Sequence, residues 1–96
     1  MYLYVYEHLH HSQKVTTKVG VSIHPETRVE NFRLKYRSDG FVFLKKWLMP
    51  SRADAFALET LVCKSFPRYW RREWLDAMPN EVCQFIEDQL KGAKNG

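Results

Sequence analysis

Glu59 is the residue whose surroundings most suggest chemistry. It lies in a segment, 51–66, whose pattern predicts a helix, and side chains three and four positions apart are neighbours on a helix surface. None of its neighbours at those offsets can pair with a charge, namely Ala55, Phe56, Val62 and Cys63. A carboxylate in an apolar stripe is costly unless it is compensated, and a metal ion is one compensator. The helix alone favours a plainer interpretation, in which Glu59 lies at the edge of the stripe and reaches water.

A second group of polar residues lies where a predicted strand, 15–22, passes into a helix. Gly20 near the strand end permits close approach of a ligand or another backbone. Arg28 lies about one turn into the helix, near its positive end. Tyr4 and Lys18 are expected to share one face of a hairpin, where a basic residue would lower the pKa of a phenol. The ordinary alternatives are packing for the tyrosine and solvation for the arginine.

Segment 67–75 interleaves basic and aromatic residues, including Arg68, Arg71, Arg72, Trp70 and Trp74. Arginine binds phosphate through a forked set of donors, and aromatic rings stack on bases, so the segment is one candidate for binding nucleic acid. An equally weighted alternative is that Trp70, Trp74 and Leu75 fill the core where two helices meet while the arginines are solvated. Lys35 belongs to a second scatter of positive charge, for which a solvated surface is the plainer interpretation.

Composition predicts one small globular domain. The chain has 96 residues, of which 45% are hydrophobic and 15% aromatic, so a single domain over 1–90 with a polar tail over 91–96 is expected. We see neither an apolar run of membrane-spanning length nor a secretory pattern, and Cys63 and Cys83 are expected to be free thiols. These features favour a cytoplasmic protein. The net charge of +4 is compatible with a nucleic-acid partner.

The elements that position these residues follow from periodicity. Alternating patterns predict strands over 2–9, 15–22 and 41–48, the last interrupted at Lys45-Lys46. Helix starts are predicted at Pro25, at Ser51 and at Pro79. The order β-β-α-β-α-α predicts an α+β fold in which helices flank a three-stranded antiparallel sheet.

These pieces, in this order, resemble the GIY-YIG nuclease superfamily and most closely its small, phage- and bacteria-associated T5orf172-like branch. The opening strand with Tyr4 resembles the first signature tripeptide, and Lys18-Val-Gly20 resembles the second. The helix carrying Glu59 resembles the glutamate helix of the family. The matches to the pattern that follows the second tripeptide are Ser22, Pro25 and Arg28.

The resemblance implies a metal-dependent endonuclease acting on nucleic acid, with DNA favoured over RNA. It assigns Glu59 as the ligand of Mg²⁺ or Mn²⁺, Tyr4 as the base or orienter of water, and Arg28 as the stabiliser of charge. Lys18 would lower the pKa of Tyr4 or bind phosphate. The residues expected to contact nucleic acid are Lys18, Arg28, Lys35, Arg68, Arg71 and Arg72.

The chain departs from the family's pattern at four positions. Lys18 replaces the second signature tyrosine, as is common in this branch, and Arg72 replaces a glycine. Phe32 and Cys63 stand where histidines are frequent in the family.

Two other functions are compatible with these residues. One is a catalytically inactive module that binds nucleic acid, and the other is a small protein-interaction or inhibitor protein. Target selection by a nuclease of this size would need loops, a homodimer or a protein partner. The nuclease interpretation further requires that Tyr4, Arg28 and Glu59 line one cleft.

Overall fold

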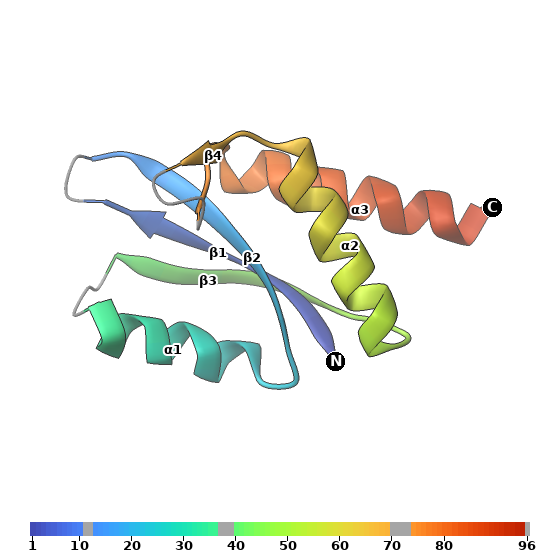
Figure 1. Ribbon diagram of the computed structural model, residues 1–96, viewed down its shortest axis with the longest axis horizontal. Coiled ribbons are helices and arrows are strands. Elements are labelled where there is room, and N and C mark those ends of the chain that lie inside the picture. Colours follow the sequence, from blue (N-terminus) through green and yellow to red (C-terminus); the bar gives the residue numbers. More distant parts are fainter. Residues whose placement is uncertain (11–12, 37–39, 70–73, 96) are drawn as a thin grey trace.

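The computed structural model describes residues 1–10, 13–36, 40–69 and 74–95, and Figure 1 shows its elements. The strands are β1 (Tyr2–Leu9), β2 (Val15–Ser22), β3 (Phe41–Leu48), β4 (Arg68–Tyr69) and β5 (Trp74–Leu75). The helices are α1 (Pro25–Tyr36), α2 (Arg52–Ser65) and α3 (Pro79–Asn95). The α+β class and the three long strands agree with the sequence prediction. In the described ranges, no helix combines the length and the apolar character that crossing a membrane requires.

The sheet has five strands in the order β3-β1-β2-β5-β4, and neighbouring strands are antiparallel. The prediction of a three-stranded sheet was therefore wrong. Strands β4 and β5 contain two residues each, which is too short for the period-two pattern that reveals a strand. β5 joins β2 where Leu75 pairs with Thr17.

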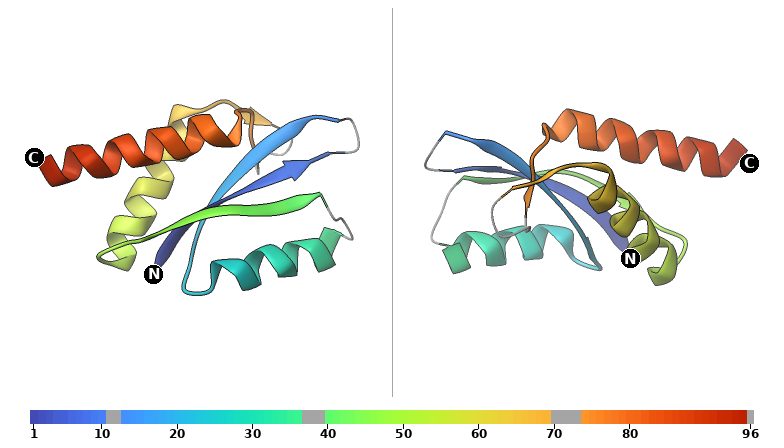
Figure 2. Two further views of the ribbon diagram at one scale, coloured as in Figure 1. Left: turned by 180° about the vertical axis from the view of Figure 1, so that it is seen from behind. Right: turned by 45° about the horizontal axis from the view of Figure 1, so that its top comes forward.

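Alternation along β1 separates two hydrophobic cores on opposite faces of the sheet. Leu3 and Val5 face the core that α2 and α3 cover, whereas Tyr4 and Tyr6 face the core that α1 covers. The views in Figures 1 and 2 accordingly show α1 and α3 on separate sides of the sheet. The α1-side core consists of Tyr4, Tyr6, Val29, Phe41 and Trp74.

Strand β3 runs without a break through Lys45 and Lys46, where the sequence predicted an interruption. The two lysines form ion pairs on opposite faces of the sheet, with Glu87 of α3 and Glu26 of α1 respectively. The irregularity in the strand is instead a bulge at Leu44, where the register with β1 shifts. The lysine pair therefore ties the strand to both helical layers.

The helix starts follow the local signals in the sequence. The Oγ of Ser51 accepts a hydrogen bond from the backbone N–H of Asp54 at 3.1 Å and so caps α2. Pro25 and Pro79 open the other two helices, as predicted. Helix α3 continues to Asn95, so it includes most of the segment, 91–96, that was expected to form a polar tail.

Trp74 and Leu75 are core residues, with exposed fractions of 1% and 2%. For these two side chains, the core-filling alternative is therefore the correct one. Arg68 remains exposed at the start of the same segment. The residues between, 70–73, lie outside the described ranges.

Gly20 provides the space that the ring of Tyr4 occupies. The two residues are register partners across the β1–β2 ladder. A Cβ at Gly20 would lie 2.5 Å from the Cζ atom and 2.8 Å from the Cε1 atom of Tyr4. The backbone φ of Gly20 is not positive, so the need for glycine is steric rather than conformational. A tyrosine ring, not a ligand or another backbone, makes the close approach expected at this glycine.

We predict that Gly20→Ala lowers the free energy of unfolding by about 1–3 kcal/mol, because the ring of Tyr4 must move within a packed core. Gly92→Ala is the matched control. Nothing lies within 4 Å of the added Cβ there, and alanine is the better helix former by up to about 1 kcal/mol. Urea denaturation measures both. In a Tyr4→Ala background the Gly20→Ala penalty should largely vanish, and a penalty that persists in full would rule out the ring as the obstacle.

Candidate active site

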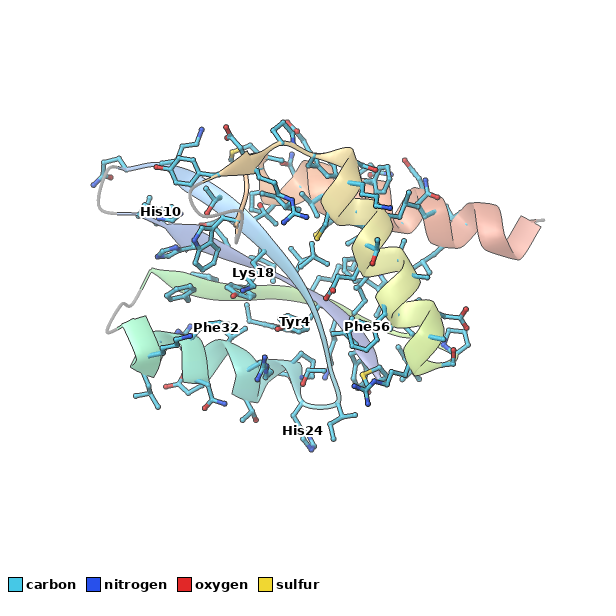
Figure 3. All side chains as sticks on the ribbon, in the orientation of Figure 1. Tyr4, His10, Lys18, His24, Phe32 and Phe56 are labelled. Atoms are coloured by element: carbon cyan, nitrogen blue, oxygen red, sulfur yellow. The ribbon has the colours of Figure 1, made fainter. Side chains whose placement is uncertain are left out.

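A cleft of about 430 Å³ opens over the β1–β2 ladder, between α1 and α2. In Figure 3, Tyr4 and Lys18 lie between these two helices, with Phe32 on the α1 side and Phe56 on the α2 side. The lining residues are Tyr4, Lys18, Val19, Gly20, Val21, Arg28, Phe32, Phe56, Glu59, Cys63 and Arg68. All four residues that the sequence suggested as catalytic therefore lie in one cleft.

Tyr4 forms the floor of the cleft and is only 2% exposed. Burial raises the pKa of its phenol, and the hydrogen bond and positive charge of Arg28 lower that pKa only part of the way. The negative charge of Glu59 adds to the rise. The expectation that Lys18 would lower the pKa of Tyr4 was therefore wrong in two respects, since the net shift is upward and the opposing cation is Arg28. Burial of a phenol cannot be read from strand alternation, which is why the sequence missed it.

Phe32 contacts two of the cations that line the cleft, Lys18 and Arg28. Its ring centroid lies 4.6 Å from the Nζ of Lys18 and 5.8 Å from the Cζ of Arg28. The Nζ of Lys18 also lies 5.3 Å from the ring centroid of Trp74. Contacts between a cation and an aromatic face are attractive and restrict where the charge can move. Phe32 therefore restricts where both basic side chains lie in the cleft.

No such role could be assigned to Phe32 from its position in the sequence, because an aromatic residue on a helix stripe is normally part of the core. The available signal was its spacing from Arg28, since residues four apart are neighbours on a helix.

Glu59 faces the cleft from α2, which packs on β2. Two of its neighbours on the helix, Ala55 and Val62, are fully buried. The other two, Phe56 and Cys63, line the cleft beside it. Burial raises the pKa of the Glu59 carboxyl, and the charge of Lys18 partly opposes the rise. Glu59 is thus half-buried in a concave site rather than simply solvated at the edge of a stripe.

The chain matches one family of known proteins over nearly its whole length. Residues 1–91 match the T5orf172 domain family. The chain belongs to that family. The T5orf172 family is associated with the GIY-YIG/HNH-like nuclease superfamily. Membership of the family therefore indicates a nuclease-like or nucleic-acid-related role. No curated protein and no solved structure matches the chain.

The residues of the T5orf172 domain fit a metal held by a single carboxylate. Among the described residues, no group of three or more histidine, cysteine, aspartate or glutamate side chains is arranged to hold an ion. Among the described residues that line the cleft, Glu59 is the only acidic one. It takes part in none of the ion pairs found within the described ranges. Magnesium is commonly held by one or two carboxylates with waters and phosphate oxygens, and manganese also prefers oxygen ligands.

The other basic residues proposed to contact nucleic acid are distributed differently. Arg68 lines the cleft, and its Nε donates a hydrogen bond to the backbone oxygen of Cys63 at 3.2 Å. Lys35 lies outside the cleft, in a smaller pocket on α1. Arg71 and Arg72 lie outside the described residues.

The raised pKa of Glu59 predicts a pH-dependent effect on stability when metal is removed with EDTA. A carboxyl whose folded pKa is raised binds its proton more tightly in the folded state, so its contribution to stability falls as pH rises from the ordinary value of 4.5 through the raised value. Glu59→Gln should therefore gain stability relative to wild type over that window and then level off. The gain should stay below about 1 kcal/mol, because water screens the half-exposed carboxylate.

Urea denaturation between pH 4 and pH 8 measures this difference. Glu81→Gln, which removes a negative charge from an exposed position on α3, supplies the baseline. A relative gain that shrinks as pH rises would contradict the predicted direction.

Proposed function

We propose that this T5orf172 domain is a metal-dependent endonuclease that hydrolyses phosphodiester bonds in nucleic acid, with DNA favoured over RNA. The observation that carries the proposal is that Tyr4, Arg28 and Glu59, from three different elements, line one cleft. The described lining also contains three cations and one carboxylate, a balance that favours a polyanionic substrate. A homodimer or a protein partner would supply target selection.

The metal would be Mg²⁺ or Mn²⁺, held by Glu59. When bound, such an ion neutralises charge on the phosphate and assists departure of the leaving oxygen. Burial of the Glu59 stem among apolar neighbours restricts the carboxylate to few rotamers, which supports its use as a fixed ligand.

Arg28 and Lys18 would stabilise the negative charge that develops on the phosphate. A guanidinium offers two parallel donors to phosphate oxygens, and an ammonium adds a point charge. Phe32 holds both cations in place before substrate arrives. Donors that are already positioned lose little energy to reorganisation in the transition state, which is the main source of electrostatic catalysis.

Tyr4 would orient the attacking water rather than exist as a phenolate base. Burial keeps its pKa above the ordinary value of 10.0, so the phenol is neutral at physiological pH. A neutral phenol both donates and accepts a hydrogen bond and can fix the direction of a water molecule. Its contact with Gly20 fixes the ring itself.

Removing the charge of Glu59 or of Arg28 should abolish cleavage without unfolding the protein. We expect Glu59→Gln and Arg28→Ala each to lower metal-dependent nicking of supercoiled DNA by about 10²-fold or more. Gel assays with Mg²⁺ or Mn²⁺, and with EDTA as a blank, measure this loss. Glu81→Gln and Lys64→Ala change charge at exposed positions outside the cleft and should retain wild-type activity.

Undiminished cutting by Glu59→Gln would refute the assignment of the metal ligand. Salt-dependent DNA binding by wild type without any metal-dependent cleavage would identify the inactive binding module instead. Absence of both binding and cleavage would favour the protein-interaction alternative.

The role of Tyr4 can be tested through the pH dependence of kcat/KM. If Tyr4 orients water, Tyr4→Phe should lower the rate by about 10²-fold while leaving the shape of the pH–rate profile unchanged. A phenolate base predicts a wild-type rate that climbs toward the raised pKa of Tyr4 and a variant that lacks this climb. Loss of an alkaline limb in Tyr4→Phe would therefore overturn the orienting role.

A further inference from the structure

A second, smaller pocket of about 150 Å³ lies on α1 and adjoins the cleft. It is lined by Arg28, Asn31, Phe32 and Lys35. The last three lie three, four and seven residues after Arg28, so all four follow one face of the helix. Arg28 and Phe32 line both the pocket and the cleft. The two sites are therefore neighbours that share a cation and an aromatic ring.

The lining of this pocket suits an anion. It offers a guanidinium, an ammonium and a side-chain amide, and none of its described lining residues is acidic. The two acidic residues of α1 have cationic partners elsewhere. Glu26 pairs with Lys46 of β3 at 2.8 Å, and Glu30 pairs with Arg33 at 3.1 Å. Both carboxylates of α1 therefore form ion pairs with cations outside the pocket lining, Lys46 and Arg33.

The spacing along α1 separates Lys35 from a phosphate that would bind in the cleft. Seven residues of α-helix span about 10 Å along the axis, whereas successive phosphates of one DNA strand are about 3.4 Å apart along the duplex axis. A phosphate bound beside Tyr4 and Arg28 would therefore lie several ångströms from Lys35. Lys35 is placed to meet a different phosphate of the same strand.

We infer that the pocket formed by Arg28, Asn31, Phe32 and Lys35 is a subsite for a backbone phosphate that flanks the phosphate to be cleaved. The substrate strand would then leave the cleft along α1, with Arg28 shared between the two phosphates and Lys35 binding the flanking one. Asn31 would donate a hydrogen bond to the same group. The identification of one phosphate as the cleaved one rests on the proposed function. The proposal that the pocket binds an anion does not rest on it.

Binding measured in EDTA tests the subsite without any need for cleavage. Fluorescence anisotropy with labelled single-stranded and duplex oligonucleotides gives the slope of log Kd against log salt for each variant. Loss of one phosphate contact reduces the slope by about 0.9 for duplex or about 0.7 for single strands. We expect that reduction in Lys35→Ala, with wild-type slopes in Lys35→Arg and in the exposed control Lys64→Ala.

A cleavage comparison separates the subsite from the active site. With Mn²⁺, Lys35→Ala should lower kcat/KM on an oligonucleotide about tenfold, the scale of one charge-assisted contact. It should leave the rate unchanged on bis(p-nitrophenyl) phosphate, which carries a single phosphate. Arg28→Ala should lower both rates.

The outcomes distinguish failure of the two proposals. Wild-type behaviour of Lys35→Ala in both assays, or no oligonucleotide binding by wild type at low salt, would overturn the subsite. The expected change in slope without cleavage of any substrate would support the subsite and overturn the proposed nuclease activity. Binding of inorganic phosphate that is lost in Lys35→Ala, with unchanged oligonucleotide slopes, would assign the pocket to a free anion and overturn the proposal.

Discussion

The contact between the ring of Tyr4 and the backbone of Gly20 determines how the rest of the cleft is built. It requires the β1–β2 register in which Tyr4 faces Gly20 and Tyr6 faces Lys18. A slip of one residue would move every side chain of a strand to the opposite face of the sheet. The phenol of Tyr4 on β1 and the ammonium of Lys18 on β2 would then lie on opposite faces of the sheet. The tight packing of one ring on one glycine therefore selects the face on which chemistry can occur.

The electrostatics of the cleft follow from this packing. Tyr4 is buried and neutral, so Arg28 can lie against it without forming a permanent ion pair with a phenolate. Lys18 is placed between the rings of Phe32 and Trp74 and still acts on the charge of Glu59. Aromatic rings thus contact both Lys18 and Arg28. An aromatic ring competes with an incoming phosphate for a cation less strongly than a carboxylate would.

Much of this architecture could be predicted from the sequence, for identifiable reasons. The long strands alternate clearly, and proline or a capping serine marks each helix start, so periodicity and local chemistry were sufficient. The two-residue strands β4 and β5 carry no period, and their place in the sheet depends on a tertiary pairing with Thr17. Burial also determines pKa values that residue spacing cannot predict. Alternation placed Lys18 on the face of Tyr4, but it could not show that desolvation dominates the pKa of the phenol.

The two positions at which histidines are frequent in the family bear on what kind of catalysis this cleft can support. Phe32 cannot transfer a proton, and burial raises the pKa of the Cys63 thiol, which makes it a poor base at neutral pH. Tyr4 is also held in its protonated form. Under the proposed function, in which Glu59 holds the metal, such a cleft would have little capacity for moving protons through its own side chains, and the proton of an attacking water would pass to solvent. Its capacity lies in binding negative charge with cations that are already positioned, and electrostatic stabilisation of this kind is often the largest single contribution to catalysis.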